Sequence, residues 1–461
     1  MVGLMITHSI IQKSQIKSAH RIDAEYFQPE YLELEKKIHS TNSCRLWRNI
    51  EGRFITGPFG SEFGVENYTS ESQYRYVRGK DVKEFFLLDD DNVYIPEKDY
   101  ERLKKYSLKE GDVLVSVVGT LGNAAIVDSS TVPAIFSCKS TVFRTNSINS
   151  HYFIAYLNSR YGYKLLKRSV RGAVQTGLNI DDLKSLPVFI PSQMIQESIA
   201  SFVLSAKKEN DRSKSIYSQA EDLLLEELEL KNFKPKEELS YIVNLSNVKS
   251  AHRTDAEYFQ PKFKKIEEKL IKDFNAKRIK NLDFIKVTTG QYSEEYTTKD
   301  QGKPYIRGTD LTKGTVNLDN LVYIDLDRQI PSKKAKEGDV VVTRVGTIGI
   351  SARLPKEVEG GTISDNLIRL RFSEEDLNSF YASLYFNTIG SQLMIRESRG
   401  SVQARLNQET LKEIVLPILP KSTQQKVADL VHQSHQAHRN AKELLEKAKQ
   451  KIEKMILGEI N

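Results

Sequence analysis

Glycine-rich loops with hydroxyl, amide and basic side chains recur in the first half of the chain. They read GPFGSEFG (57–64), YVRGKDV (76–82), VSVVGTLGN (115–123) and RGAVQTGLN (171–179). Glycine permits a close backbone approach to a ligand, and such side chains hydrogen-bond phosphates and base edges. The candidate contact residues are Ser61, Arg78, Lys80, Ser116, Thr120, Asn123, Arg171, Gln175 and Thr176. A turn or strand end explains any one of them as well, but the set favours a binding surface.

The second half of the chain repeats three of these loops with different side chains. They read YIRGTDL (305–311), VTRVGTIGI (342–350) and RGSVQARLN (399–407). The candidate contact residues here are Arg307, Thr309, Thr343, Arg344, Thr347, Arg399, Gln403 and Arg405. The sequence therefore predicts two similar binding surfaces that carry different contact side chains.

Motifs of common catalytic sites are missing from the sequence. There is no GxxxxGK[ST], HExxH or GxSxG, and no GxGxxG between a strand and a helix. Adjacent prolines are also missing, which excludes the Asp/Asn-Pro-Pro-aromatic tetrapeptide of amino-methyltransferases. We expect no catalytic residue; the alternative is a cryptic nuclease or methyltransferase built from scattered Asp, Glu and Lys.

Two groups of residues suggest metal ligands at first sight. His432, His435 and His438 fan over more than one face of a helix, so a solvated or interfacial surface is favoured. The run 89–91, three aspartates, is better explained by a turn. We therefore expect no metal site.

Composition sets broad limits. The 461 residues should form two to four domains, and 68 basic against 61 acidic residues give a net charge of +7. This charge is compatible with a nucleic-acid partner but also with an ordinary soluble protein. Cys44 and Cys138 indicate neither disulfides nor zinc. No apolar run is long enough to span a membrane, so a cytoplasmic protein is expected.

Long stretches of the sequence occur twice. KSAHRIDAEYFQPEY (17–31) returns as KSAHRTDAEYFQPKF (249–263), and EGDVLVSVVGTLG (110–122) returns as EGDVVVTRVGTIG (337–349). A duplicated chain imitates a two-fold homodimer and presents two similar surfaces.

Each repeat predicts the same order of elements. A short apolar strand-like piece (9–21, 241–253) precedes a helix that begins near Pro29 or Pro261. Short β-like runs fill about 41–190 and 273–419, interrupted by helical stretches at 151–168 and 377–396.

A long helix with a coiled-coil seam closes each repeat, from about 193 to 232 and from about 423 to 457. We expect the two helices to pair antiparallel; the alternative is that each stripe packs on its own domain. The seam residues proposed as a subunit interface are Ile199, Phe202, Ile216, Leu223, Val427, Leu430, Leu444 and Ile452.

The predicted fold is mixed α/β: a tandem repeat of two globular α/β domains separated by two long antiparallel coiled-coil-like helices, with pseudo-two-fold symmetry. The expected boundaries are 1–40 for the opening strand and helix, 41–191 for domain 1, 192–232 for helix 1, 233–272 for the linker and the helix opening repeat 2, 273–420 for domain 2, and 421–461 for helix 2.

At these motifs the chain resembles the specificity subunit of type I restriction-modification systems. The resemblance covers essentially the whole chain. It rests on the loops and repeats quoted above and on LPVFIPS (186–192) and LPILPKS (416–422), which enter the long helices. The opening block RIDAEYFQP is also similar to systems whose methylation and cleavage share one companion polypeptide.

This resemblance implies a non-catalytic subunit that reads a split site in double-stranded DNA. It implies as partners two adenine-N6 methyltransferase subunits and endonuclease/translocase subunits, with S-adenosylmethionine, ATP and Mg bound only in those partners. Because Thr309 replaces Lys80 and Arg344 replaces Val117, it implies unlike half-sites around an unread spacer. The alternative is a non-catalytic scaffold that binds RNA or proteins without sequence-specific DNA recognition.

Overall fold

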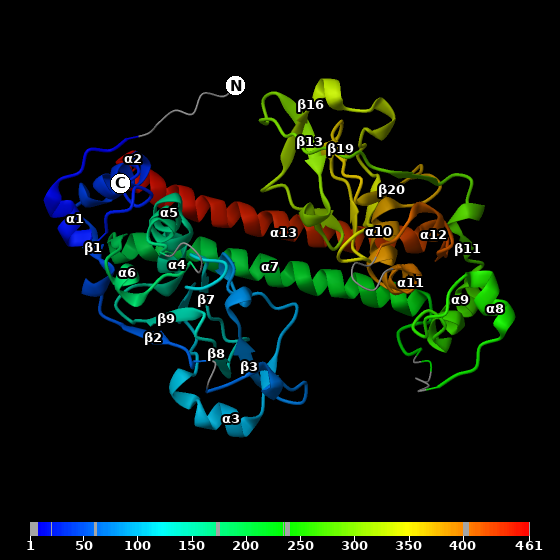
Figure 1. Ribbon diagram of the computed structural model, residues 1–461, viewed down its shortest axis with the longest axis horizontal. Coiled ribbons are helices and arrows are strands. Elements are labelled where there is room, and N and C mark those ends of the chain that lie inside the picture. Colours follow the sequence, from blue (N-terminus) through cyan, green and yellow to red (C-terminus); the bar gives the residue numbers. More distant parts are fainter. Residues whose placement is uncertain are drawn as a thin grey trace. The chain divides into compact units, whose positions relative to one another are not determined.

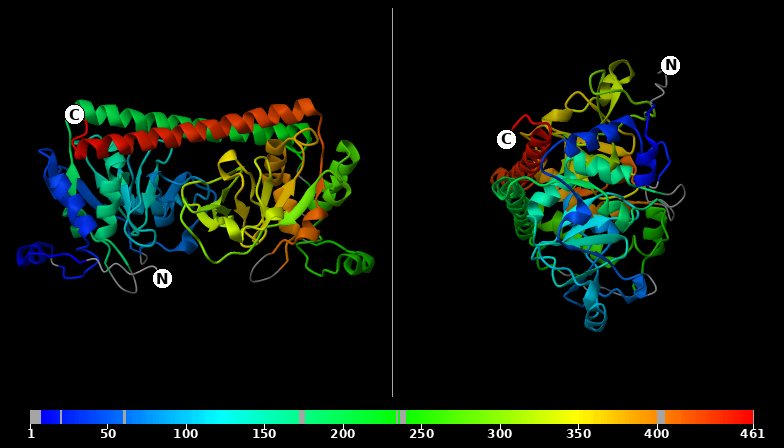
Figure 2. Two further views of the ribbon diagram at one scale, coloured as in Figure 1. Left: turned by 90° about the horizontal axis from the view of Figure 1, so that it is seen from above. Right: turned by 90° about the vertical axis from the view of Figure 1, so that its left-hand side faces the viewer.

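The computed structural model describes residues 8–19, 21–59, 62–171, 176–233, 235, 240–399 and 405–460. The chain forms two compact units (Figures 1 and 2). The first unit comprises Met1–Glu209 with Asn440–Asn461, and the second comprises Asn210–Arg439. Both contain helices and strands, which confirms the predicted mixed α/β class.

The first unit combines two small sheets with covering helices. Its sheets have the strand orders β2-β9-β6-β7-β4 and β5-β3-β8, and β1 pairs with β10. Its helices are α1 (Lys13–Ala19), α2 (Pro29–His39), α3 (Glu97–Arg102), α4 (Ser150–Asn158), α5 (Arg160–Arg168), α6 (Ile180–Lys184), the part of α7 (Gln193–Glu227) up to Glu209 and the part of α13 (Lys421–Ile456) from Asn440. Its strands are β1 (Cys44–Leu46), β2 (Arg53–Thr56), β3 (Tyr74–Val77), β4 (Phe85–Phe86), β5 (Tyr94–Ile95), β6 (Val113–Ser116), β7 (Ala124–Ile126), β8 (Ala134–Phe136), β9 (Ser140–Arg144) and β10 (Pro187–Phe189).

The second unit repeats this plan. Its sheets have the orders β12-β20-β17-β18 and β16-β13-β19, with the pairs β11-β21 and β14-β15 beside them. Besides the remaining parts of α7 and α13, its helices are α8 (Leu245–Ala251), α9 (Pro261–Phe274), α10 (Ser379–Asn387), α11 (Ile389–Glu397) and α12 (Gln408–Lys412). Its strands are β11 (Lys277–Arg278), β12 (Lys286–Thr289), β13 (Gly302–Ile306), β14 (Leu311–Thr312), β15 (Thr315–Val316), β16 (Val322–Asp325), β17 (Val340–Thr343), β18 (Ser351–Arg353), β19 (Thr362–Ile363), β20 (Leu367–Arg371) and β21 (Val415–Leu416).

Equivalent side chains fix the same helix in both units. Asn149 and Asn378 cap α4 and α10 by accepting hydrogen bonds from backbone N–H groups in the first turn. Gln196 Oε1 accepts from the Asn149 N–H at 3.1 Å, and Gln424 Oε1 accepts from the Asn378 N–H at 2.9 Å. The start of each long helix is thereby attached to the globular part of its unit.

The expected strand-like opening pieces are wrong, because helices α1 and α8 form there. Strands need a neighbouring strand, whereas the apolar residues that suggested one, Ile10 and Ile242, are 94% and 99% exposed. The helices predicted to begin at Pro29 and Pro261 are confirmed, and each has its proline in the first turn.

The long helices pack against each other within each unit. In the first unit Ile199 and Val203 of α7 share a core cluster with Ala448 and Ile452 of α13. Lys451 Nζ donates to Ser198 Oγ at 2.8 Å there, and Figure 2 shows the end of α13 beside the start of α7. In the second unit the pairing is reversed: the end of α7 and the start of α13 supply a shared cluster. The predicted antiparallel pairing is confirmed.

Candidate nucleic-acid interface

In the first unit the candidate loops converge on the turn between β8 and β9. The N–H groups of Val117 and Val118 donate to the Lys139 carbonyl at 2.9 and 3.3 Å. The Leu178 N–H in turn donates to the Val117 carbonyl at 3.0 Å, which joins the loop at 171–179 to the same place. A Cβ added at Gly57 would lie 2.5 Å from the Phe136 carbonyl oxygen, so this glycine permits a close chain approach. Four segments distant in sequence therefore form one loop cluster.

The second unit builds the equivalent loop cluster with the same backbone hydrogen bonds. The Arg344 N–H donates to the Asn366 carbonyl at 3.0 Å, and the Leu406 N–H donates to the Arg344 carbonyl at 2.9 Å. Gly290 takes the place of Gly57, because an added Cβ would lie 2.1 Å from the Ser364 carbonyl oxygen. The scaffold is thus shared, while the side chains on it differ.

Two of the candidate arginines are engaged inside their own domain. Arg78 lies 2.9 Å from Asp81 and 3.3 Å from Asp91, and its side chain is only 16% exposed. Arg307 holds Asp310 at 2.9 Å in the same manner, and hydrogen bonding to this carboxylate raises the pKa of Arg307. Both arginines therefore stabilise the turn that follows β3 or β13.

Other candidates close the neighbouring turn. Ser116 is fully buried and its hydroxyl donates to the carbonyls of Thr120 and, at 3.3 Å, Asn123. Asn123 Nδ2 donates to the Val82 carbonyl at 3.2 Å. In the second unit Thr343 is 3% exposed and its Oγ1 accepts the Ile350 N–H at 3.2 Å. These side chains hold the loop rather than project from it.

Among the described residues, the guanidinium of Arg344 has one hydrogen bond, and one of its buried nitrogens has no partner. Nη1 donates to the Asp365 carbonyl at 3.1 Å. Nε is buried and has no hydrogen-bond partner among the described residues. The guanidinium is thus held at the base of the turn between β19 and β20.

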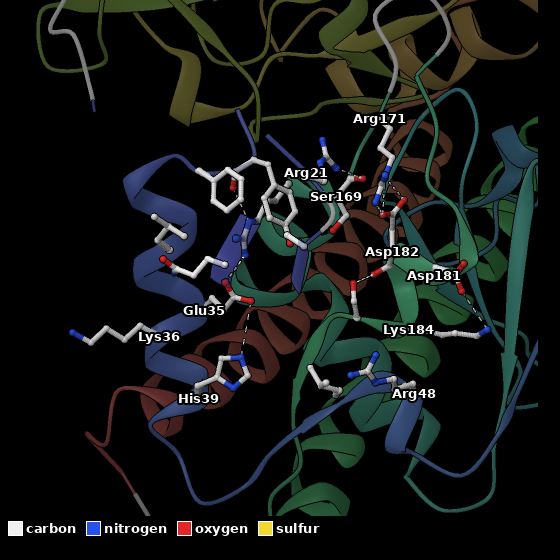
Figure 3. Close-up of a pocket in the computed structure, with 18 residues that line it drawn as sticks. Arg21, Glu35, Lys36, His39, Arg48, Ser169, Arg171, Asp181, Asp182 and Lys184 are labelled. Atoms are coloured by element: carbon white, nitrogen blue, oxygen red, sulfur yellow. Dashed lines mark hydrogen bonds and ion pairs between the residues drawn. The ribbon is translucent and has the colours of Figure 1, made fainter. Parts of the chain in front are cut away.

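Arg171 stands at the edge of a cleft of about 920 Å³ (Figure 3). Its Nη2 donates to Asp182 Oδ1 at 2.6 Å, and Figure 3 shows the two side chains directed toward each other. Lys184 is paired with Asp181 at 3.5 Å on the same wall. The ion pair between Arg171 and Asp182 attaches the start of this loop to α6, whereas the pair of Lys184 and Asp181 lies within that helix.

The remaining candidates lie at the surface. Lys80 is 59% exposed and pairs with Asp91 at 2.9 Å. The other exposed candidates are Thr120, Thr176, Thr309, Thr347, Arg399 and Arg405. Ser61, Gln175 and Gln403 lie outside the described residues.

Sequence reasoning missed the turn on which each loop cluster is built. Lys139 and Asn366 are exposed there, in the strings SCKS and SDNL. These strings share only one serine, so similarity between the repeats gave no signal. Two exposed aromatic residues are also absent from the predicted contacts: Phe59 (65% exposed), two residues after Gly57, and Tyr292 (64% exposed), two residues after Gly290.

The repeated RxDAEYFQP block (21–29 and 253–261) attaches the opening segment of each repeat to the globular part of its unit. Tyr26 lies between two guanidinium groups, with Arg168 at 3.9 Å and Arg21 at 4.6 Å from the ring centre. Arg21 also donates to the carbonyls of Ser169 and Val170 at 3.0 Å. The block therefore attaches the opening segment to the end of α5, just before the loop at 171.

The second unit has the same attachment. Arg253 and Arg396 lie 4.5 and 4.6 Å from the ring centre of Tyr258. Arg253 pairs with Asp255 at 2.6 Å, as Arg21 does with Asp23. The repetition of the RxDAEYFQP block in the sequence is thus explained by the same packing role in both units.

The predicted subunit-interface residues divide into two groups. Ile199, Ile216, Val427 and Ile452 are at most 9% exposed and pack inside the chain. The half-buried residues are Phe202, Leu223, Leu430 and Leu444. Only the second group offers apolar surface to a partner in this arrangement.

The described residues contain no group of three or more His, Cys, Asp or Glu side chains able to hold a metal ion. Of the three histidines on α13, His435 is mostly buried, and its ring centre lies 5.9 Å from that of Phe380. Within the described part of the chain, no helix has the length and apolar character that crossing a bilayer requires.

Together the fold and the loop clusters define a duplicated binding protein: two recognition domains on one chain, joined by paired helices. The sequence model of the type I restriction modification DNA specificity domain matches residues 61–222 and 271–454. The chain belongs to this family, and the resemblance to the specificity subunit is confirmed.

Solved structures of the same class are similar to the chain over most of its length. The S subunit of a type I restriction-modification system from M. genitalium is 14% identical, with a TM-score of 0.42, over 91% of this chain and 97% of that chain. The HsdS subunit from Thermoanaerobacter tengcongensis is 13% identical, with a TM-score of 0.30, over 91% and 98%. A comparison with curated proteins gives no match.

Proposed function

We propose that this chain is the DNA-recognition subunit of a type I restriction-modification complex. Each unit reads one half of a bipartite, asymmetric site through its loop cluster. The chain itself performs no chemistry; S-adenosylmethionine, ATP and Mg belong to the partner subunits. The observation that carries the proposal is that one hydrogen-bonded loop scaffold occurs twice with different exposed side chains, such as Lys80 against Thr309.

In adenine methylation, one subunit can recognise the DNA sequence while another carries out the methyl transfer. A methyltransferase flips its adenine out of the stack and distorts the DNA, whatever the surrounding sequence. Sequence selectivity can then come from a separate subunit whose two domains bind the half-sites on either side of the adenine. Two identical domains would read a palindrome, whereas two different domains read two different half-sites.

The paired helices α7 and α13 set the spacer between the half-sites and dock two adenine-N6 methyltransferase subunits. Half-buried apolar residues on these helices, Phe202 and Leu444 among them, provide docking surface. Endonuclease/translocase subunits join the assembled methyltransferase.

The test is to co-express the chain with its adenine methyltransferase and to map N6-methyladenine in the host genome at single-base resolution. A split, asymmetric motif methylated on both strands is the expected result. Methylation without a motif, or none with a methyltransferase that is active in another complex, would favour the scaffold alternative. Purified chain with DNA and either Mg or S-adenosylmethionine should show no turnover, which tests the cryptic-enzyme alternative.

A further inference from the structure

Lys139 and Asn366 occupy the same place in the two loop clusters. The Lys139 carbonyl accepts the Val117 N–H at 2.9 Å. The Asn366 carbonyl accepts the Arg344 N–H at 3.0 Å, and Arg344 is the repeat counterpart of Val117. Both side chains are exposed. They therefore leave equivalent backbone positions toward solvent.

The two side chains differ from most candidate residues in being unengaged. Within the described part of the chain, neither the Lys139 ammonium nor the Asn366 amide has a hydrogen-bond or ion-pair partner in its own domain. Arg78 and Arg307, by contrast, are held by Asp81 and Asp310. A group that reads a ligand must have free donors or acceptors, and these two positions retain theirs.

Both side chains also project from a fixed backbone. Lys139 packs so closely on Gly79 that a Cβ added there would lie 2.8 Å from the Lys139 Cβ. The Asn366 N–H donates to Ser364 Oγ at 3.2 Å, and the Ser364 N–H donates to the Ile306 carbonyl at 2.8 Å. A rigid base of this kind places a side chain reproducibly against a ligand.

We propose that Lys139 and Asn366 are specificity-determining residues that make the two half-sites unlike; this inference rests on the proposed function. Lysine only donates, which suits the O6 and N7 acceptors of guanine in the major groove. Asparagine both donates and accepts, which suits N6 and N7 of adenine. Lys139 thus reads a guanine in the half-site of the first unit, and Asn366 reads an adenine in the half-site of the second.

The experiment exchanges the two side chains. Lys139→Asn and Asn366→Lys are each co-expressed with the methyltransferase, and N6-methyladenine is mapped as for the wild type. Lys139→Asn should change the preferred base at one guanine of one half-site and leave the other half-site intact. Asn366→Lys should change one adenine in the opposite half-site. The exposed residues Lys98 and Asn281, changed to Asn and Lys, serve as matched controls and should leave the motif unchanged.

A second measurement covers variants that fold poorly. Wild-type complex is titrated with duplexes carrying 7-deazaguanine or 7-deazaadenine at one position at a time. One 7-deazaguanine and one 7-deazaadenine should each weaken binding about ten- to hundredfold. Lys139→Ala should abolish the first effect only, and Asn366→Ala the second only.

The outcomes separate the two proposals. A wild-type split motif that persists unchanged in both exchange variants overturns the assignment of Lys139 and Asn366 but not the proposed function. Weaker binding to all duplexes alike, without a changed base preference, also overturns it, because it shows phosphate contacts. Absence of any wild-type motif contradicts the proposed function itself.

Discussion

Ser213 and Ser434 hydrogen-bond each other reciprocally between α7 and α13 in the second unit. The Ser213 hydroxyl donates to the Ser434 carbonyl at 2.8 Å, the Ser434 hydroxyl donates to the Ser213 carbonyl at 2.8 Å, and the two hydroxyl oxygens are 3.1 Å apart. Both residues are less than 9% exposed. Counted along the repeats, their counterparts in the first unit are Ala441 and Ala206, also buried. At this equivalent position the helix seam is therefore polar in one unit and apolar in the other, which makes the two units' seams chemically distinct.

Replacing either serine with alanine should lower the stability of the second unit. We expect each single change, Ser213→Ala or Ser434→Ala, to cost about 1 kcal/mol, the usual net contribution of a hydrogen bond. A double-mutant cycle should show coupling, because the two hydroxyls share one contact. Urea unfolding measures these effects, and Ser205→Ala, on an exposed position of α7, is the control. Equal stability of all variants would contradict this account.

The buried carboxylate of Asp339 should matter far more than a surface pair. It is 1% exposed and accepts bonds from Arg371 at 2.6 Å and from the Lys336 N–H at 2.9 Å. Asp339→Ala leaves Arg371 without its carboxylate, although the Lys334 carbonyl still accepts from it at 2.8 Å; we expect a loss of about 3 kcal/mol in the free energy of unfolding. The exposed pair of Lys412 and Glu409 provides the control, since Glu409→Ala should cost well under 1 kcal/mol. A thermal unfolding series would show the contrast.

His435 should make the second unit sensitive to mild acid. Burial, with repulsion from Arg439 and the neighbouring histidines, lowers the pKa of His435 to about 4. Between about pH 6.5 and pH 4 the unfolded chain binds a proton that the folded chain does not. Stability therefore falls as the pH drops through this window, by on the order of 3 kcal/mol from this group.

His435→Gln should flatten the pH dependence in that window, while His8→Gln, on an exposed terminal residue, should not. Unfolding midpoints measured from pH 7.5 to pH 4 decide the matter. Parallel curves for His435→Gln and wild type would show that other groups cause the acid sensitivity.

Substitution by alanine should have different effects at Gly79 and at Gly308, which are equivalent glycines in the loops RGKD and RGTD. At Gly79 an added Cβ would clash with the Lys139 Cβ, whereas no described atom lies within 4 Å of the corresponding position at Gly308. We expect Gly79→Ala to cost about 1 to 3 kcal/mol and to weaken reading of one half-site. Gly308→Ala should be neutral in both respects. Methylation maps and thermal unfolding of the two variants test this, and equal behaviour would contradict the close packing.

Helix length should control spacer length. One helical turn spans about 5.4 Å, and DNA rises about 3.4 Å per base pair. Deleting one turn from both α7 and α13 should therefore shorten the preferred spacer by one or two base pairs. The methylated motif gives the spacer length directly. An unchanged spacer in the deletion variant would show that the helices do not set its length.

Patterns that depend on local order were predictable from the sequence. The repeat, the helices after Pro29 and Pro261 and the long seams all follow from residue spacing, and they are present. The opening pieces were misjudged because a few apolar residues fit a strand or a helix equally well, and only a neighbouring strand could decide between them.

The candidate site was predictable as a set of loops but not as a set of contacts. Arg78 is a basic residue in a glycine loop, which favours a ligand contact, yet Asp81, three residues later, forms an ion pair with it. That pairing depends on the backbone turn. Lys139 lies in a turn with little similarity between the repeats, so its position became visible only through the hydrogen bonds that converge on its carbonyl.

The first unit combines residues 1–209 with residues 440–461, and this imposes an order on folding during synthesis. Residues 210–439 are complete as a unit before residue 440 is made. The core of the first unit still lacks Ala448, Ile452 and Ile456 of α13 at that moment. The unit whose synthesis begins first is therefore the one that is completed last, and until then Ile199 and Val203 of α7 lack the apolar contacts that α13 supplies.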